Sequence, residues 1–242
     1  MKFIAASSSE AGGRKSNEDY CNYVQQQRFG CWVVADGLGG HEGGEFASLI
    51  AVSRIVETAG RKMLHSDAIM RYYIQEAQEA LHARQKLEMR LASMRTTIVV
   101  LASDHKTASW AHVGDSRLYH FRDGAIASET KDHSVCQSLV NLGVITRAQI
   151  RQHEDRSRLL RVLGAEGAAR PDVRTNVTLK PGDRFLLCTD GLWEYVTETE
   201  MEIDLAKSAT PKDWIRRMEQ RLLPRVKPGH DNYSSIAIFV ES

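Results

Sequence analysis

The sequence predicts an α+β fold in which packed β-sheets are covered by helices. Apolar runs of strand length open the chain, return in its middle and close it. Two pairs of segments with helical spacing interrupt these runs, one pair within residues 42–88 and one within 199–223. Because no repeat, low-complexity tract or linker divides the 242 residues, we expect a single domain that spans residues 1–242.

Individual elements follow from the local pattern. Apolar runs bounded by turn residues predict strands at residues 2–6, 19–24, 31–35, 97–102, 109–113, 117–122, 125–128, 173–179, 185–188 and 235–240. Helical periodicity predicts helices at residues 42–59, 66–88, 134–142, 199–207 and 211–223. In the first helix, the expected buried side carries Phe46, Leu49, Ile50, Ser53 and Val56. Ser66 is the expected N-cap of the second helix.

Composition limits the possible function classes. Hydrophobic residues make up 42% and charged residues 26% of the chain, which is ordinary for a globular protein. The formal net charge is +1, so bulk electrostatics favour neither nucleic acid nor a membrane as a partner. No apolar run approaches the roughly 20 residues that span a bilayer, and residues 1–6 are too short an apolar run for a signal peptide. Without CxxC spacing, Cys31 and Cys188 are predicted to be buried free thiols, and these features together predict a cytoplasmic protein.

Aspartates mark the ends of three apolar runs. Asp36, Asp115 and Asp190 each follow such a run at a predicted polar turn, and Asp231 lies just before a fourth run. A buried strand that ends in a carboxylate delivers a hard oxygen ligand to the edge of a sheet. We therefore expect these four side chains to meet in an oxygen-lined metal centre.

The alternative for each aspartate is a simple turn, since Asp-Gly is the commonest hairpin signal. Asp123 and Gly124 lie between two short strand-like runs and are interpreted as a hairpin turn only. Asp36 and Asp190 differ, because a long apolar run precedes each and no matching strand follows closely.

A charged cluster precedes the second predicted strand. Arg14, Glu18 and Asp19 fall within six residues, which on their own would be a solvated turn. Together with the four aspartates, the cluster favours a functional role for Arg14, because the planar guanidinium of arginine matches phosphate oxygens in geometry. Carboxylates next to it can hold the cations that balance phosphate charge.

Together these residues resemble the metal-dependent protein phosphatase family, the type 2C or PPM-type serine/threonine phosphatases. The matching stretches occur in the order of the family: Arg14 to Asp19, Val34 to His41, Gly44 to Ser48, Thr96-Thr97, Gly114 to Arg117, Lys131 to Ser134, Thr189 to Trp193 and Asp231-Asn232. The resemblance spans nearly the whole chain. It implies a four-layer αββα sandwich, in which helix pairs flank two mainly antiparallel sheets and metals lie in the cleft between them.

The resemblance also implies roles for individual residues. The implied metal ligands are Asp36, which would bridge two Mn²⁺ or Mg²⁺ ions, the Gly37 carbonyl, Asp190, Asp231, Glu18, Asp19 and, for a third and weaker ion, Asp115. Arg14 would bind the substrate phosphate. The nucleophile would be a water between the ions, attacking phosphorus without a phosphoenzyme intermediate.

Some positions depart from the family pattern. Leu38 stands where many eukaryotic members carry a histidine proposed as the general acid, and His41 is a minor candidate for that role. Arg95 replaces a common glycine at a strand end near the cleft. Residues 132–169 match the flap of the family in placement but only loosely in sequence. Five arginines of this flap would either attract acidic phosphoproteins or form a solvated helix face: Arg147, Arg151, Arg156, Arg158 and Arg161.

We predict a bacterial, Mn²⁺- or Mg²⁺-dependent protein-serine/threonine phosphatase. Its expected partners are phosphorylated proteins, namely a Ser/Thr kinase or a substrate of that kinase. One alternative is a catalytically inactive module that binds phosphoproteins or kinases, although such proteins typically lose the metal aspartates that are present here. Another keeps the chemistry but acts on a phosphorylated anti-sigma-factor antagonist.

Overall fold

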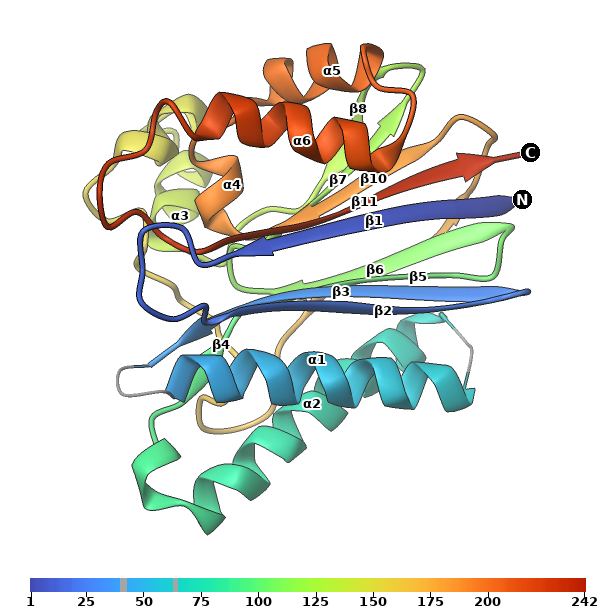
Figure 1. Cartoon of the computed structure of the whole chain (residues 1–242). Helices are drawn as coiled ribbons and strands as arrows, with labels where there is room; N and C mark the ends of the chain where they lie inside the picture. The colour runs from blue at the N-terminus through green and yellow to red at the C-terminus, as the bar shows by residue number, and fades with distance from the viewer. Residues whose placement is uncertain (40–42, 63–64) are drawn as a thin grey trace.

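The computed structural model describes residues 1–39, 43–62 and 65–242. It has four layers in the order helices, sheet, sheet, helices (Figure 1). The strands are β1 (Lys2–Glu10), β2 (Asp19–Gln26), β3 (Phe29–Leu38), β4 (Arg95–Thr96), β5 (Ile98–Ser103), β6 (Thr107–Val113), β7 (Arg117–Arg122), β8 (Ala125–Glu129), β9 (Asp172–Thr178), β10 (Arg184–Cys188) and β11 (Tyr233–Glu241). The helices are α1 (Gly43–Lys62), α2 (Asp67–Leu87), α3 (Val135–Asn141), α4 (Asp190–Trp193), α5 (Glu198–Ala206) and α6 (Pro211–Leu222), with short 3₁₀ turns at Met89–Leu91 and Arg147–Gln152.

Two antiparallel sheets form the centre of the sandwich. One has the order β1-β11-β10-β7-β8, and the other has the order β2-β3-β5-β6-β9 with β4 paired to β3. The first and last strands of the chain are neighbours, with Lys2 opposite Glu241 and Glu10 opposite Tyr233. Helices α5 and α6 cover the first sheet, and α1 and α2 cover the second (Figure 1). The predicted fold is therefore confirmed.

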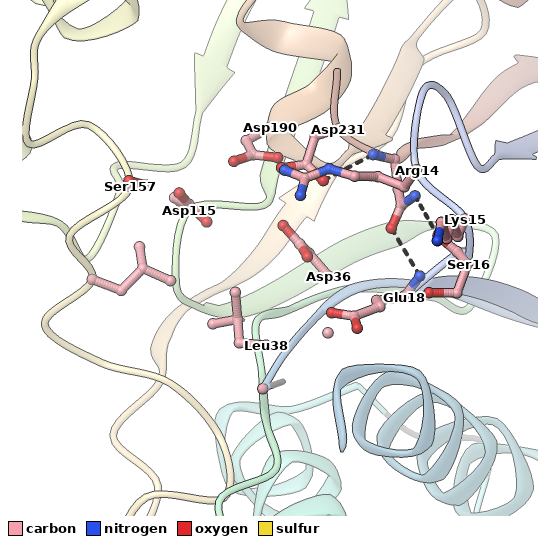
Figure 2. A pocket seen from close by; sticks show the side chains of 14 residues that line it. Arg14, Lys15, Ser16, Glu18, Asp36, Leu38, Asp115, Ser157, Asp190 and Asp231 are labelled. Carbon is pink, nitrogen blue, oxygen red and sulfur yellow. Dashed lines mark hydrogen bonds and ion pairs between the residues drawn. The ribbon is translucent and has the colours of Figure 1, made fainter. Parts of the chain in front are cut away.

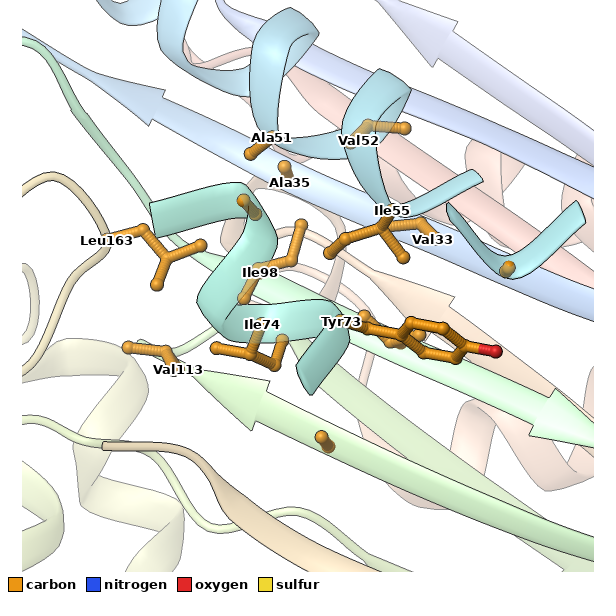
Figure 3. Close-up of a cluster of buried hydrophobic side chains, with 14 of the residues drawn as sticks. Val33, Ala35, Ala51, Val52, Ile55, Tyr73, Ile74, Ile98, Val113 and Leu163 are labelled. Atoms are coloured by element: carbon orange, nitrogen blue, oxygen red, sulfur yellow. The ribbon is translucent and has the colours of Figure 1, made fainter. Parts of the chain in front are cut away.

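Strand β3 shows how the sequence produces two apolar layers. Trp32 and Val34 pack between the sheets, whereas Val33 and Ala35 pack under the helices α1 and α2. Successive side chains of a strand point to opposite faces, so a continuous apolar run buries both sides. Figure 3 shows the helix-side cluster, in which Val33 and Ala35 lie near Ile55 of α1.

Helix α1 buries a different side from the predicted one. Phe46 and Ile50 are only partly buried and Leu49 is exposed, whereas Ala47 and Ala51 are buried against β3. Small side chains allow the helix axis to approach the sheet closely. A prediction that ranks residues by hydrophobicity alone favours the larger side chains and misses this effect. The prediction of the buried side was therefore wrong.

Other local predictions are confirmed. The Ser66 side chain accepts a hydrogen bond from the Ile69 N–H and caps α2. The turn at Asp123 and Gly124 joins β7 to β8, and both residues have positive φ. Cys31 and Cys188 are buried free thiols. No helix in the described part of the chain has the length and apolar character of a membrane span.

The arginines of the flap, residues 132–169, all form ion pairs with carboxylates of this chain. Each of the five pairs with a carboxylate: Arg147 with Glu129 and Glu198, Arg151 with Glu198, Arg156 with Glu194, Arg158 with Asp155 and Arg161 with Asp172. Four of these arginines tie the flap to β8, β9 and the α4–α5 region, whereas the Arg158–Asp155 pair lies within the flap. Because most of these side chains are also 38–69% exposed, the attraction of acidic phosphoproteins stays a prediction.

Candidate metal centre

A cleft of about 430 Å³ opens at one end of the sandwich. It is lined by Arg14, Lys15, Ser16, Glu18, Asp36, Gly37, Leu38, Gly39, Asp115, Ser157, Leu159, Asp190, Asp231 and Asn232. Seven of the eight predicted site residues are in this set. The eighth, Asp19, lies behind the wall of the cleft, where its buried carboxylate accepts a hydrogen bond from Thr189 Oγ1 at 2.8 Å.

The four predicted aspartates reach the cleft from different strands. Asp115 follows β6, Asp190 is the first residue of α4 directly after β10, and Asp231 precedes β11. Figure 2 shows Asp36, Asp190 and Asp231 facing a common space, with Asp115 beside them. Segments distant in sequence therefore converge on one site, as the sequence predicted.

Asp36 does not lie at a turn, and this prediction was wrong. It is inside β3, which continues to Leu38 because β4 pairs with its last residues. The Asp36 carbonyl accepts hydrogen bonds from Thr97 N–H at 2.8 Å and Thr96 Oγ1 at 2.7 Å, and its N–H donates to Thr97 Oγ1 at 3.0 Å. These bonds hold the backbone of Asp36 rigidly, which suits a residue that must present its carboxylate at a fixed point. Arg95 belongs to β4 and extends this strand end.

Glycines permit the close packing around these aspartates. A Cβ at Gly37 would lie 2.1 Å from the Gly44 carbonyl oxygen and 2.6 Å from that of Glu18. A Cβ at Gly191 would lie 2.0 Å from the Asn232 carbonyl oxygen. Neither position can carry a side chain without displacing neighbouring backbone.

The carboxylates of the site disfavour one another's ionisation. Burial raises the pKa of Asp19 and of Asp115 to about 7. Burial, with added repulsion from neighbouring carboxylates, raises the pKa of Asp36 and of Asp190 well above the usual range. Buried carboxylates that crowd in this way are stabilised as anions by a divalent cation, which takes oxygen ligands. The donor set therefore fits Mn²⁺ or Mg²⁺.

Arg14 is the cation at the mouth of the cleft. Its Nη2 lies 3.0 Å from Asp231 Oδ2, and both side chains are about half exposed, at 53% and 51%. Asn232 fixes the loop that carries Arg14, since its Nδ2 donates to the carbonyls of Ala11 and Ser16 at 2.8 and 2.9 Å. Its Oδ1 accepts from Glu18 N–H at 2.8 Å. One amide side chain thus joins the N-terminal and C-terminal parts of the site.

Asp115 is supported from the other sheet. Trp193 Nε1 donates to the Asp115 carbonyl at 3.0 Å. The guanidinium of Arg117 stacks 3.5 Å from the ring centroid of Trp193 and binds Asp132 through two hydrogen bonds of 2.8 Å. This buried ion pair holds the indole in place.

Sequence reasoning assigned no site role to Ser157, Leu159 and Glu194. The first two enter from the flap, and no local pattern of the sequence predicts that contact. Glu194 follows Asp190 by four residues, a spacing that places two side chains on the same side of a helical turn, so it could have been found. Burial raises the pKa of Glu194, and the Asp231 carboxylate contributes to this rise. His41, the predicted minor candidate acid, lies outside the described residues.

A second group of metal-ligand types lies outside the cleft. One ligand atom from each of His112, His133 and Asp172 falls within 4.8 Å of the others. However, Nη1 of the Arg161 guanidinium lies 3.2 Å from His133 Nε2, so a cation already faces this group. The guanidinium of Arg161 also lies 2.9 Å from Asp172 Oδ1. The carboxylates of the cleft are therefore the better candidate for a metal centre.

Comparisons with known proteins show the family to which this chain belongs. A sequence profile of the family described as protein phosphatase 2C matches residues 8–227. Serine/threonine phosphatase stp of Listeria welshimeri is 37% identical over 182 residues, which cover 73% of this chain and 71% of the relative. Stp1 from Staphylococcus aureus has a crystal structure that matches with a TM-score of 0.90 at 28% identity, covering 100% of this chain and 96% of that one. The catalytic domain of PstP in complex with two manganese ions matches with a TM-score of 0.82 at 28% identity, covering 99% of each chain.

A two-sheet sandwich with a carboxylate-lined cleft at one end defines a class of metal-dependent phosphatases, and this chain has both features. The chain belongs to the protein phosphatase 2C family. It is a protein-serine/threonine phosphatase of the bacterial type, and the resemblance found in its motifs is confirmed.

Proposed function

We propose that the cleft hydrolyses phosphoserine and phosphothreonine monoesters on proteins, and that the single catalytic domain spans residues 1–242. The observation that carries this proposal is the convergence of four aspartates, Asp36, Asp115, Asp190 and Asp231, on one cleft beside the half-exposed Arg14. In this proposal the protein ligands of two Mn²⁺ or Mg²⁺ ions are Glu18, Asp19, Asp36, the Gly37 carbonyl, Asp190 and Asp231, and Asp115 would serve a third, weaker ion. When bound, such ions neutralise phosphate charge and lower the pKa of a bound water.

The protein itself supplies positioning and charge. Arg14 would leave Asp231 to bind phosphate oxygens with its planar guanidinium, which matches them in geometry. Asp36, held by Thr96 and Thr97, would keep its carboxylate fixed while the substrate changes shape. Leu38 cannot donate a proton, and no histidine is among the described residues that line the cleft. His41 therefore stays the minor candidate for protonating the leaving oxygen, with solvent as the alternative.

The substrates are proposed to be phosphorylated proteins, in particular a Ser/Thr kinase or a protein that it phosphorylates. The support is the similarity to named bacterial serine/threonine phosphatases. The four free cysteines favour a reducing compartment, so we propose that the enzyme acts in the cytoplasm. The inactive-module alternative is not favoured, because the whole predicted carboxylate set is present.

The test is hydrolysis of a phosphothreonine peptide with and without Mn²⁺, comparing the wild type with Asp190→Asn. We expect metal-dependent turnover that falls about 100-fold or more in the variant, because several kcal/mol of charge stabilisation are lost. Asp204→Asn is the matched control, since Asp204 is also buried but pairs with Arg221 far from the cleft. Metal-independent turnover, or equal activity of Asp190→Asn, would contradict the proposal. Activity on the phosphothreonine peptide is also compared with activity on a phosphorylated anti-sigma-factor antagonist. This comparison distinguishes a phosphatase that opposes a Ser/Thr kinase from one that acts on such an antagonist.

A further inference from the structure

His133 connects the backbone next to Asp115 with the flap. Its N–H donates to the Gly114 carbonyl at 2.9 Å, and its Nδ1 accepts the Gly114 N–H at 3.2 Å. Gly114 has φ +103°, and a Cβ there would lie 2.7 Å from the Thr97 side chain, so this residue has little room to move. The two hydrogen bonds therefore fix the direction in which the chain enters Asp115.

The same residue also holds the flap. The His133 carbonyl accepts the Leu160 N–H at 2.7 Å. The neighbouring Ser134 forms an isolated bridge with Leu159, and Val135 N–H donates to the Arg158 carbonyl at 2.9 Å. Residues 157–160 are thus attached to the segment around His133, and Ser157 and Leu159 of this stretch line the cleft.

The ring of His133 is held in one orientation. Its Nδ1 accepts the Gly114 N–H at 3.2 Å, and its Nε2 lies 3.2 Å from Arg161 Nη1 and 3.4 Å from Asp172 Oδ1. The ring stacks on His112, with centroids 4.5 Å apart and an interplanar angle of 13°. Burial lowers the pKa of His133 to about 4, so the ring stays neutral at physiological pH. Both neighbours keep Nδ1 directed at Gly114.

We propose that His133 is a positioning residue that sets Asp115 and flap residues 157–160 relative to each other, and thereby sets the affinity of the ion held by Asp115. The inference rests on the proposed function, since it assumes that Asp115 is a metal ligand. His133 does not line the cleft, so it acts through Gly114 and Leu160 rather than by touching substrate.

The experiment compares Mn²⁺ binding by titration calorimetry in the wild type, His133→Ala, His133→Gln and His133→Asn. The amide oxygen of asparagine can replace Nδ1 and accept the Gly114 N–H, whereas glutamine places its oxygen one bond farther away. We expect His133→Ala and His133→Gln to weaken the lowest-affinity Mn²⁺ equivalent about 10- to 100-fold, as is typical when an orienting partner of a ligand is lost. His133→Asn should remain close to the wild type, and the tighter equivalents should be unchanged in all variants.

His65→Ala is the matched control, because His65 also contacts a serine and an aspartate, Ser109 and Asp104, but does not line the cleft. Wild-type Mn²⁺ affinities in His133→Gln would overturn the proposal. Equal losses in His133→Gln and His133→Asn, or a uniform loss over all equivalents, would also overturn it, since either result would indicate a general effect on folding. Absence of metal-dependent turnover in the wild type would contradict the proposed function. That result is distinguishable, because turnover is measured independently of these Mn²⁺ binding constants.

Discussion

Asp19 and Asp36 lie directly opposite each other in the antiparallel register of β2 and β3. Like charges in such a pair destabilise a sheet, and burial of both residues adds a desolvation penalty. In the metal-free protein the ionised carboxylates of Asp19 and Asp36 would therefore repel each other. A divalent cation bound between them would attract both and offset this repulsion.

Asp36→Asn is expected to stabilise the metal-free protein while removing its activity. The substitution eliminates one of the crowded buried charges but keeps the shape of the side chain. In EDTA at pH 8, we expect Tm to rise by about 2–4 °C, which corresponds to roughly 1 kcal/mol for a chain of this size. Differential scanning calorimetry checks this value, and addition of Mn²⁺ should raise Tm in the wild type only. A lower Tm of Asp36→Asn in EDTA would contradict the expectation.

The stability of the metal-free protein should fall as pH rises. Asp19 and Asp115 have folded-state pKa values raised from 3.8 to about 7. A raised pKa means that the folded state binds the proton more tightly than the unfolded state does. The stability that this proton contributes to the folded state is lost as pH increases through about 7. Thermal unfolding in EDTA between pH 5.5 and 8 measures this loss. Saturating Mn²⁺ should remove the decline, because the cation competes with protons for the same oxygens; an identical decline with and without Mn²⁺ would argue against that.

Gly191→Ala should destabilise the protein strongly. The new Cβ would meet the Asn232 carbonyl oxygen at 2.0 Å, which forces the loops of Asp190 and Asp231 apart. We expect a loss of about 2–3 kcal/mol in the free energy of unfolding, measured with urea. Gly60→Ala is the control, because no heavy atom lies within 4 Å of a Cβ there and the residue is in α1. This control should gain about 0.5–1 kcal/mol.

Arg14→Ala and Arg14→Lys should both lower kcat/KM by about 10- to 100-fold for a phosphothreonine peptide. The loss of charge-assisted hydrogen bonds worth about 1.5–3 kcal/mol accounts for this range. Lysine should not restore activity, because a single ammonium cannot reproduce the planar fork. Folding stability should change by no more than about 1 kcal/mol, since the ion pair with Asp231 is about half exposed. Full activity of the lysine variant would contradict a bidentate role for Arg14.

The four aspartates could be predicted because each lies next to an apolar run that predicts a strand from its own residues. The length of β1 could not be predicted, since Ser7, Ser8 and Ser9 give no apolar signal. They extend the strand to Glu10 because they pair with residues more than 220 positions later in the sequence. Their hydroxyls are also used: Ser8 Oγ donates to Glu219, and Ser234 Oγ bonds to Ser9.

The flap contribution to the site could not be predicted for a similar reason. Ser157 and Leu159 reach the cleft through the backbone hydrogen bonds of His133 and Ser134, which join segments about 25 residues apart. Neither residue has a pattern that distinguishes it from an ordinary loop residue. The continuation of β3 through Asp36 depends likewise on the two-residue strand β4.

The amide of Asn232 has a consequence for biosynthesis. It joins Ala11 and Ser16 to a segment that is synthesised more than 200 residues later. A nascent chain on the ribosome lacks both Asp231 and the partner strand of β1 until residues 231–241 have been synthesised. The site therefore cannot assemble before residues 231–241 have been synthesised, and activity requires that these two distant segments meet.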